Sequence, residues 1–97
     1  MTFAIMQGVL ASLTAKHQPI NQARRKAMPH TVRQPGLTRH DLGDEAFEAA
    51  MEERRVWIAE NCQGDHLIEP IRKDDGLVGR RYRFEDPNEA FHFRLRF

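Results

Sequence analysis

All fourteen acidic residues of this 97-residue chain lie after residue 40. The first forty residues contain no acid and six basic residues, namely Lys16, Arg24, Arg25, Lys26, Arg33 and Arg39. The patterns typical of helices and strands also lie mostly after residue 40, where apolar residues recur with regular periods. The sequence therefore predicts a small α+β domain of residues 41–97, preceded by a segment of residues 1–40 that consists of a helix and a basic extended arm.

The composition allows one hydrophobic core and no membrane span. Apolar residues make up 40% of the chain and charged residues 30%, and 97 residues are the length of one small domain. The longest nearly uncharged stretch, residues 1–15, is shorter than the roughly 20 apolar residues that a spanning helix needs. No Lys or Arg precedes this stretch, as one would in a secretory signal. We expect no membrane association, no secretion and an intracellular location.

The first sixteen residues have the period of an amphipathic helix. Their apolar side chains recur at spacings of three and four, at Phe3, Met6, Leu10 and Leu13. Gly8 in the middle costs such a helix about 1 kcal/mol relative to alanine. A helix that is marginal by itself needs a surface to lie on, so these four apolar side chains are candidates for contact with a partner.

Residues 18–40 are polar and basic, and their prolines predict an extended arm. Pro19, Pro29 and Pro35 exclude long helices, and few apolar residues could anchor the segment. Val32 to Thr38 could add a strand to the folded unit. The arm could lie on the acidic part of its own chain or on another molecule, and the sequence leaves both open.

Residues 44–62 form the clearest element, an amphipathic helix. At about 100° per residue, its apolar side chains share one arc, and they are Ala46, Phe47, Ala50, Met51, Trp57, Ile58 and Cys62. Asp44 is placed to cap its N-terminus, and Gly64 stands where a glycine often follows a helix. Arg54 lies within the apolar arc. It either packs its stem and pairs its head within the chain or presents its guanidinium to a partner.

The rest of the chain predicts strands. Residues 66–73 contain Pro70, which suits an edge strand, and Asp75-Gly76 is a hairpin signal before a second strand at residues 77–85. Asp86, Pro87 and Glu89 predict one or two helical turns. The last residues alternate, which predicts a third strand with Phe91, Phe93, Leu95 and Phe97 facing the core and His92, Arg94 and Arg96 facing water.

The expected fold is α+β. It consists of one amphipathic helix packed on a small antiparallel sheet of three to four strands, with an extended N-terminal arm. The expected core contains Trp57, Phe84, Phe93 and Phe97.

The stretch from Tyr82 to Phe97, preceded by a helix that holds Trp57 and Asn61, resembles the ending of small uncharacterised proteins encoded by tailed bacteriophages. The resemblance covers about the last forty residues and rests on a fold-forming pattern. It implies a viral origin and a role as a minor virion component or as a binder of a host protein, in the host cytoplasm or in the virion. It implies no particular functional residue.

No pattern in the sequence indicates an enzyme or a cofactor. The chain has no phosphate-binding glycine loop, hydrolase elbow or dinucleotide fingerprint. Cys62, His66 and His92 lack the paired spacing of a zinc site. A nucleophilic Cys62 is equally unsupported, because the C-terminal end of a helix raises the pKa of a thiol. We expect no catalytic activity, no metal, no cofactor and no small-molecule ligand.

The sequence favours a non-enzymatic protein-binding module whose first forty residues fold onto a protein partner or onto another copy of the chain. The candidate contact residues are Phe3, Met6, Leu10, Leu13, Arg24, Arg25, Lys26, Arg33, Arg39 and Arg54. On this hypothesis, deletion of residues 1–40 should abolish association and leave a folded domain.

The alternative is a nucleic-acid-binding protein that uses the basic arm and arginines on the strands. The candidate contacts on the strands are Arg80, Arg81, Arg83, Arg94 and Arg96. The acidic charge of residues 41–97 and an overall pI of about 8.0 argue against a dedicated binder of this class.

Overall fold

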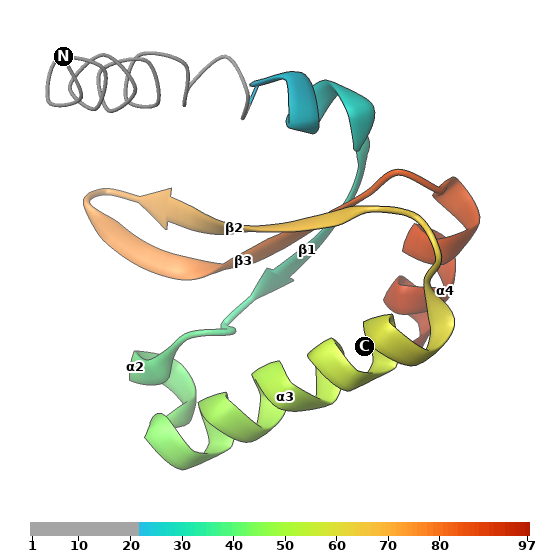
Figure 1. Ribbon diagram of the computed structural model, residues 1–97. Helices are drawn as coiled ribbons and strands as arrows, with labels where there is room; N and C mark the ends of the chain where they lie inside the picture. Colours follow the sequence, from blue (N-terminus) through green and yellow to red (C-terminus); the bar gives the residue numbers. More distant parts are fainter. Residues whose placement is uncertain (1–21) are drawn as a thin grey trace, which may run out of the picture.

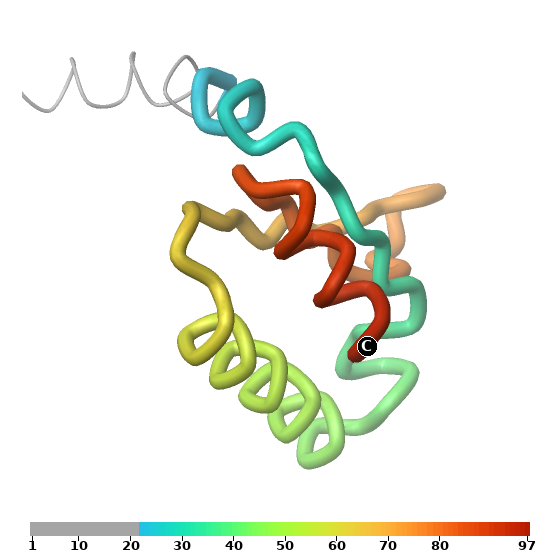
Figure 2. Tube along the Cα trace, turned by 90° about the vertical axis from the view of Figure 1, so that its right-hand side faces the viewer, coloured from blue at the N-terminus to red at the C-terminus, as the bar shows by residue number. Residues whose placement is uncertain are grey.

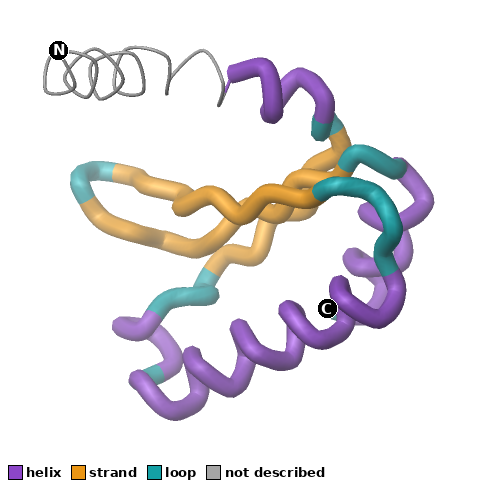
Figure 3. Tube along the Cα trace, viewed as in Figure 1, coloured by secondary structure: helices purple, strands orange, loops and turns teal. Residues whose placement is uncertain are grey.

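The computed structural model describes residues 22–97 (Figure 1; Figure 3). After helical turns at residues 22–27, the elements are β1 (His30–Pro35), α2 (Arg39–Leu42), α3 (Asp44–Asn61), β2 (His66–Lys73), β3 (Gly76–Phe84) and α4 (Pro87–Arg96). The helix expected around Phe3, Met6, Leu10 and Leu13 lies outside the described residues.

The three strands form one open antiparallel sheet in the order β1-β3-β2. Tyr82 in the central strand pairs with Val32 of β1 on one side and with Ile68 of β2 on the other. Helices α3 and α4 lie on one side of this sheet, and residues 22–27 lie on the other (Figure 1; Figure 2). The prediction of an α+β fold with a small antiparallel sheet is confirmed.

Strand β1 lies within the stretch that the sequence predicts to be an extended arm, and residues 30–35 are extended but form an edge strand of the sheet. The strand pairs with β3 from His30 to Pro35, close to the additional strand considered at Val32 to Thr38. Val32 and Leu37 are buried in the core. Prolines are compatible with this position, because β1 is an edge strand and Pro35 is its last residue. Residues 22–27 are helical rather than extended, so the folded unit begins before residue 41.

The predicted amphipathic helix is present as α3 and ends one residue earlier than expected. Its apolar arc faces the sheet, with Phe47 and Ile58 buried and Trp57 half-buried against the core. The expected N-cap at Asp44 is wrong by one residue. Gly43, with a φ of 82°, occupies the cap position without a side-chain hydrogen bond, and Asp44 starts the first turn.

The hairpin between β2 and β3 turns one residue earlier than expected. Asp74 and Asp75 both have a positive φ, of 52° and 64°, and Gly76 already belongs to β3. A two-residue turn of this kind matches the right-handed twist of the strands, and aspartate tolerates the left-handed region better than most residues.

The expected last strand is wrong, because residues 87–96 form helix α4. Asp86 caps the helix by accepting a hydrogen bond from the backbone nitrogen of Asn88 at 2.7 Å, and Pro87 takes the first helical position. Phe93 faces the core and is fully buried, whereas Phe91 and Leu95 point away from it and are 57% and 70% exposed. The predicted short helix at Asp86 is thus the start of a longer one.

The core lies between the sheet and the two helices on its covered side. Its largest members are Tyr82 and Phe84 of β3 and Phe93 of α4, whose rings are in contact. Trp57 of α3 meets Phe93 edge to face, with ring centroids 5.7 Å apart. These aromatic contacts join both helices to the central strand.

Candidate binding surfaces

We call the side of the sheet away from α3 and α4 its open face. Among the described elements only the helical turns of residues 22–27 lie on this side, where Glu69 and Ile71 are each 7% exposed. Alternation along the strands and their register assign to the open face Thr31, Arg33, Pro35, Leu67, Glu69, Ile71, Gly79, Arg81 and Arg83. The opposite side carries Tyr82 and Phe84, which are buried under the helices. The two rows that cross the open face near its middle run from Arg33 through Arg81 to Glu69, and from Thr31 through Arg83 to Leu67.

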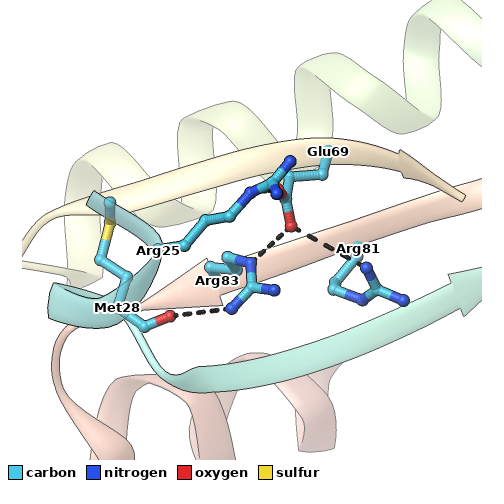
Figure 4. Close-up of polar contacts among 5 residues, drawn as sticks. All are labelled: Arg25, Met28, Glu69, Arg81 and Arg83. Atoms are coloured by element: carbon cyan, nitrogen blue, oxygen red, sulfur yellow. Dashed lines mark hydrogen bonds and ion pairs between the residues drawn. The ribbon is translucent and has the colours of Figure 1, made fainter. Parts of the chain in front are cut away.

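Glu69 is the centre of a charged cluster on this face (Figure 4). Its carboxylate is 2.5 Å from Nε of Arg83 and 2.5 Å from Nε of Arg25, and 3.9 Å from Nη1 of Arg81. Arg83 also donates to the backbone oxygen of Met28 at 3.5 Å. Glu69 thereby holds together β2, β3 and the helical turns of residues 22–27.

The same contacts determine the ionisation of Glu69, which is 7% exposed. Burial raises the pKa of this carboxyl group, but the hydrogen bonds and positive charges of Arg83 and Arg25 outweigh burial and hold the pKa below its ordinary value of 4.5. Glu69 is therefore a carboxylate at neutral pH.

A second surface is the outward face of α4, formed by Phe91 and Leu95. These residues are one turn apart and lie opposite the buried Phe93. His92 and Arg94 flank the pair, and both are exposed. This exposed apolar pair with a polar border is a candidate for a protein contact.

Besides the arginines that meet Glu69, other arginines expected at a binding site are engaged within the chain away from the open face. Arg54 donates to the side-chain oxygen of Gln34 at 2.9 and 3.2 Å and to the backbone oxygen of Ala50 at 3.0 Å. Arg39 pairs with Glu48 and with Asp44. Arg80 lies on the covered side of the sheet and donates to the backbone oxygen of Leu37 at 3.2 Å.

The remaining predicted basic residues lie in three places. Arg24, Arg25 and Lys26 are in the helical turns above the open face, and Arg33, Arg81 and Arg83 are on the face itself. Arg94 and Arg96 belong to α4, where Arg96 pairs with Glu53 at 2.7 Å and Arg94 borders the free edge of β1. The structure therefore does not bring the predicted strand arginines together as one set.

Cys62 follows α3 and is half-buried beside the core. Burial and the charges of Glu89 and Asp86 raise the pKa of its thiol to about 11, so it is protonated at neutral pH and is a poor nucleophile. Within residues 22–97, no three histidine, cysteine or acidic side chains are grouped so that they could hold a metal ion.

Sequence reasoning missed Glu69 and the outward face of α4. The sequence alone does not show that Glu69 lies beside Arg81 and Arg83, because this follows only from the register of β2 against β3. The sequence places Phe91 and Leu95 on a buried strand face, because every second residue from 91 to 97 is apolar, which is the period of a strand. On a helix the same residues form two pairs four apart, Phe91 with Leu95 and Phe93 with Phe97, on opposite faces.

Among the described residues, no helix is long and apolar enough to span a bilayer. Comparison with known proteins found no family model, no curated protein and no solved structure that matches this chain.

Proposed function

We propose that this chain is a non-enzymatic module that binds another protein, and that the outward face of α4 is part of the contact. The observation that carries the proposal is the exposure of Phe91 and Leu95, at 57% and 70%, on a helix whose other side is fixed in the core. Burial of two such side chains stabilises a complex by about 1.5–3 kcal/mol each. Contributions of this size are typical of residues at the centre of a protein interface.

The surroundings of this pair indicate the chemistry of the partner. His92 and Arg94 flank the pair, and Arg96 follows it in the last turn of the helix. A complementary surface is an apolar groove bordered by carboxylates. A second copy of the chain fits less well, because two copies of the same basic border would repel each other.

The residues of the N-terminal segment belong to the same proposal. Phe3, Met6, Leu10 and Leu13 remain predicted contacts, and so do the exposed Arg24, Lys26 and Arg33. If the chain derives from a tailed bacteriophage, as the resemblance of its last forty residues implies, the partner is a virion protein or a protein of the host.

A double substitution, Phe91→Ala with Leu95→Ala, tests the proposal. The matched control is Leu42→Ala with Val56→Ala, which removes two exposed apolar side chains, 43% and 37% exposed, from α2 and α3. A partner is first captured from an extract of the source organism, then purified and titrated calorimetrically against the three proteins. We expect at least a tenfold loss of affinity for the α4 variant and no loss for the control.

Two results would contradict the proposal. Equal affinity of the purified partner for the wild type and the α4 variant would show that α4 is not in the contact. A stable dimer of the wild type in sedimentation experiments, lost in the α4 variant, would replace the separate partner by a second copy.

A further inference from the structure

The open face of the sheet carries an unbalanced positive charge. Arg33, Arg81 and Arg83 project from it and Arg25 reaches it from the helical turns, while Glu69 is the one acidic side chain that the strand register places there. This set has three net positive charges. Arg24 and Lys26, both exposed in the same helical turns, add two more.

Arg33 and Arg81 are directly opposite each other in the register of β1 and β3. Like charges in such a cross-strand pair repel and destabilise the sheet. No described residue forms an ion pair with Arg33. Glu69, 3.9 Å from Nη1 of Arg81, offsets part of this repulsion, and an anion bound beside Arg33 would offset more of it.

Glu69 holds the guanidinium groups of Arg83 and Arg25 in position. It accepts a hydrogen bond from Nε of Arg83 and pairs with Nε of Arg25. Nη1 of Arg83 donates to the backbone oxygen of Met28, so Nη2 of Arg83 and the terminal nitrogens of Arg25 are left for other acceptors. These groups line a cavity of about 300 Å³ together with Glu69 and Arg81. Guanidinium groups held in place bind oxyanions at a smaller entropic cost than mobile ones.

The largest group of acidic residues lies on the other side of the sheet. Helix α3 contains six of them, Asp44, Glu45, Glu48, Glu52, Glu53 and Glu60. Charge is thus separated across the sheet, with a basic open face on one side and the acidic helix α3 on the other. A polyanion would be attracted to the open face and repelled from α3.

The aromatic residues of the strands indicate what kind of polyanion fits. Proteins that bind single-stranded nucleic acid stack bases on exposed aromatic rings. Here Tyr82 and Phe84 are 1% and 0% exposed and face the helices, so β3 offers no ring on its open side. Arginines without aromatic rings suit contacts with phosphate groups, and such contacts carry no sequence preference.

We propose that the open face binds the phosphate backbone of duplex nucleic acid, with Arg33, Arg81 and Arg83 as contacts. This site is separate from the contact proposed at α4, because it lies on the other side of the sheet, and it assigns Arg33 to the nucleic acid instead of to the protein partner. Glu69 acts as a positioning residue that holds Arg83 and Arg25.

The test is binding of the full chain to a 20-base-pair DNA duplex of mixed sequence, measured by fluorescence anisotropy between 50 and 300 mM salt. Arg33→Gln with Arg81→Gln removes two contacts. The slope of log K against log salt is negative, and each lost contact makes it less negative by about 0.9. We therefore expect the slope to become less negative by about 1.8 and affinity to fall roughly 50-fold at 0.1 M salt. The single variant Arg33→Gln, at an exposed position, should make the slope less negative by about 0.9.

The matched control is Arg55→Gln with Arg96→Gln, which removes the same charge from α3 and α4. This control should bind as the wild type does. Several results would overturn the proposal: no binding at 50 mM salt, equal losses in the two double variants, or tighter binding of a single strand than of the duplex. Equal competition by a polyglutamate peptide of the same charge would assign the face to an acidic protein instead.

Discussion

Gly79 stands at the closest approach of β3 to β1. A Cβ atom at this position would lie 2.8 Å from Cα of Pro35 and closer still to the backbone oxygen of Gln34. Backbone atoms of a paired strand cannot move aside without breaking the ladder. Gly79→Ala should therefore lower the free energy of unfolding by about 2–4 kcal/mol.

Gly76 provides the control for this prediction, because it lies in the same strand. The nearest atom to its Cβ would be the backbone oxygen of Lys73 at 3.5 Å, which is an ordinary contact. Gly76→Ala should change the free energy of unfolding by less than about 1 kcal/mol. Both variants are measured by urea denaturation, and an equal effect of the two would contradict the close approach of β1 at Gly79.

Glu69 should make stability depend on pH in the acidic range. Its pKa in the folded protein is lowered below 4.5, so its contribution is fully present above that value and is lost as the pH falls through the lower, folded-state pKa. Glu69→Gln should reduce the free energy of unfolding at pH 7 by about 1–2 kcal/mol. This is less than for a fully buried pair, because Arg25 is half exposed.

Glu52 is the matched control, since its carboxylate is also 2.5 Å from an arginine, Arg55, but both side chains are exposed. Exposed pairs are screened by water and contribute little. Glu52→Gln should leave the urea midpoint nearly unchanged at every pH. If the decrease in unfolding free energy caused by Glu69→Gln were as large at pH 3 as at pH 7, the ion pairs of Glu69 would not be the cause of that decrease.

At the scale of elements, α4 is where two periodicities compete. A strand would place Phe91 and Phe93 on the same face, whereas the helix places Phe93 in the core and Phe91 in water. Phe93→Ala should cost about 3–5 kcal/mol of unfolding free energy. Phe91→Ala, its matched control, should cost less than about 1 kcal/mol. Large losses in both variants would contradict the helix.

The elements that the sequence predicted well have one dominant signal each. The apolar residues around Phe47 and Ile58 recur with a period that only a helix has. The hairpin is predicted because a turn sequence separates two stretches in which apolar and polar residues alternate. The end of the chain was ambiguous, since its apolar residues alternate as in a strand. The cap at Asp86 and Pro87 was the signal for a helix, and its length could not be predicted from local pattern because packing against Tyr82 and Phe84 stabilises the later turns.

The candidate surfaces were less predictable than the elements, because they depend on register and on side-chain partners. Arg81 and Arg83 share the open face, and Arg80 between Gly79 and Arg81 points to the other side. A run of arginines in the sequence therefore divides between two environments. Arg54 was open to two interpretations, and only the position of Gln34 on β1 shows where its guanidinium binds.

At the scale of the whole molecule, the division of charge at residue 40 becomes a division between two sides of the sheet. The basic residues at positions 24–33 lie on or near the open face, and the acidic residues of α3 lie across the sheet from them. The division in the sequence therefore does not mark the border of the folded unit. Strand β1 belongs to the basic part of the sequence and to the sheet at the same time.

This arrangement predicts that a chain beginning at residue 41 does not fold. The deletion removes β1 and the buried side chains of Met28, Val32 and Leu37, and it exposes the edge of β3. We expect no cooperative transition in urea and no dispersed amide spectrum. Within the full chain, Val32→Ser should cost about 2–3 kcal/mol and its neighbour on the open face, Arg33→Ser, less than about 0.5 kcal/mol. A cooperative transition in the shortened chain would show that the sheet is stable as two strands, and β1 would then be the arm that the sequence suggested.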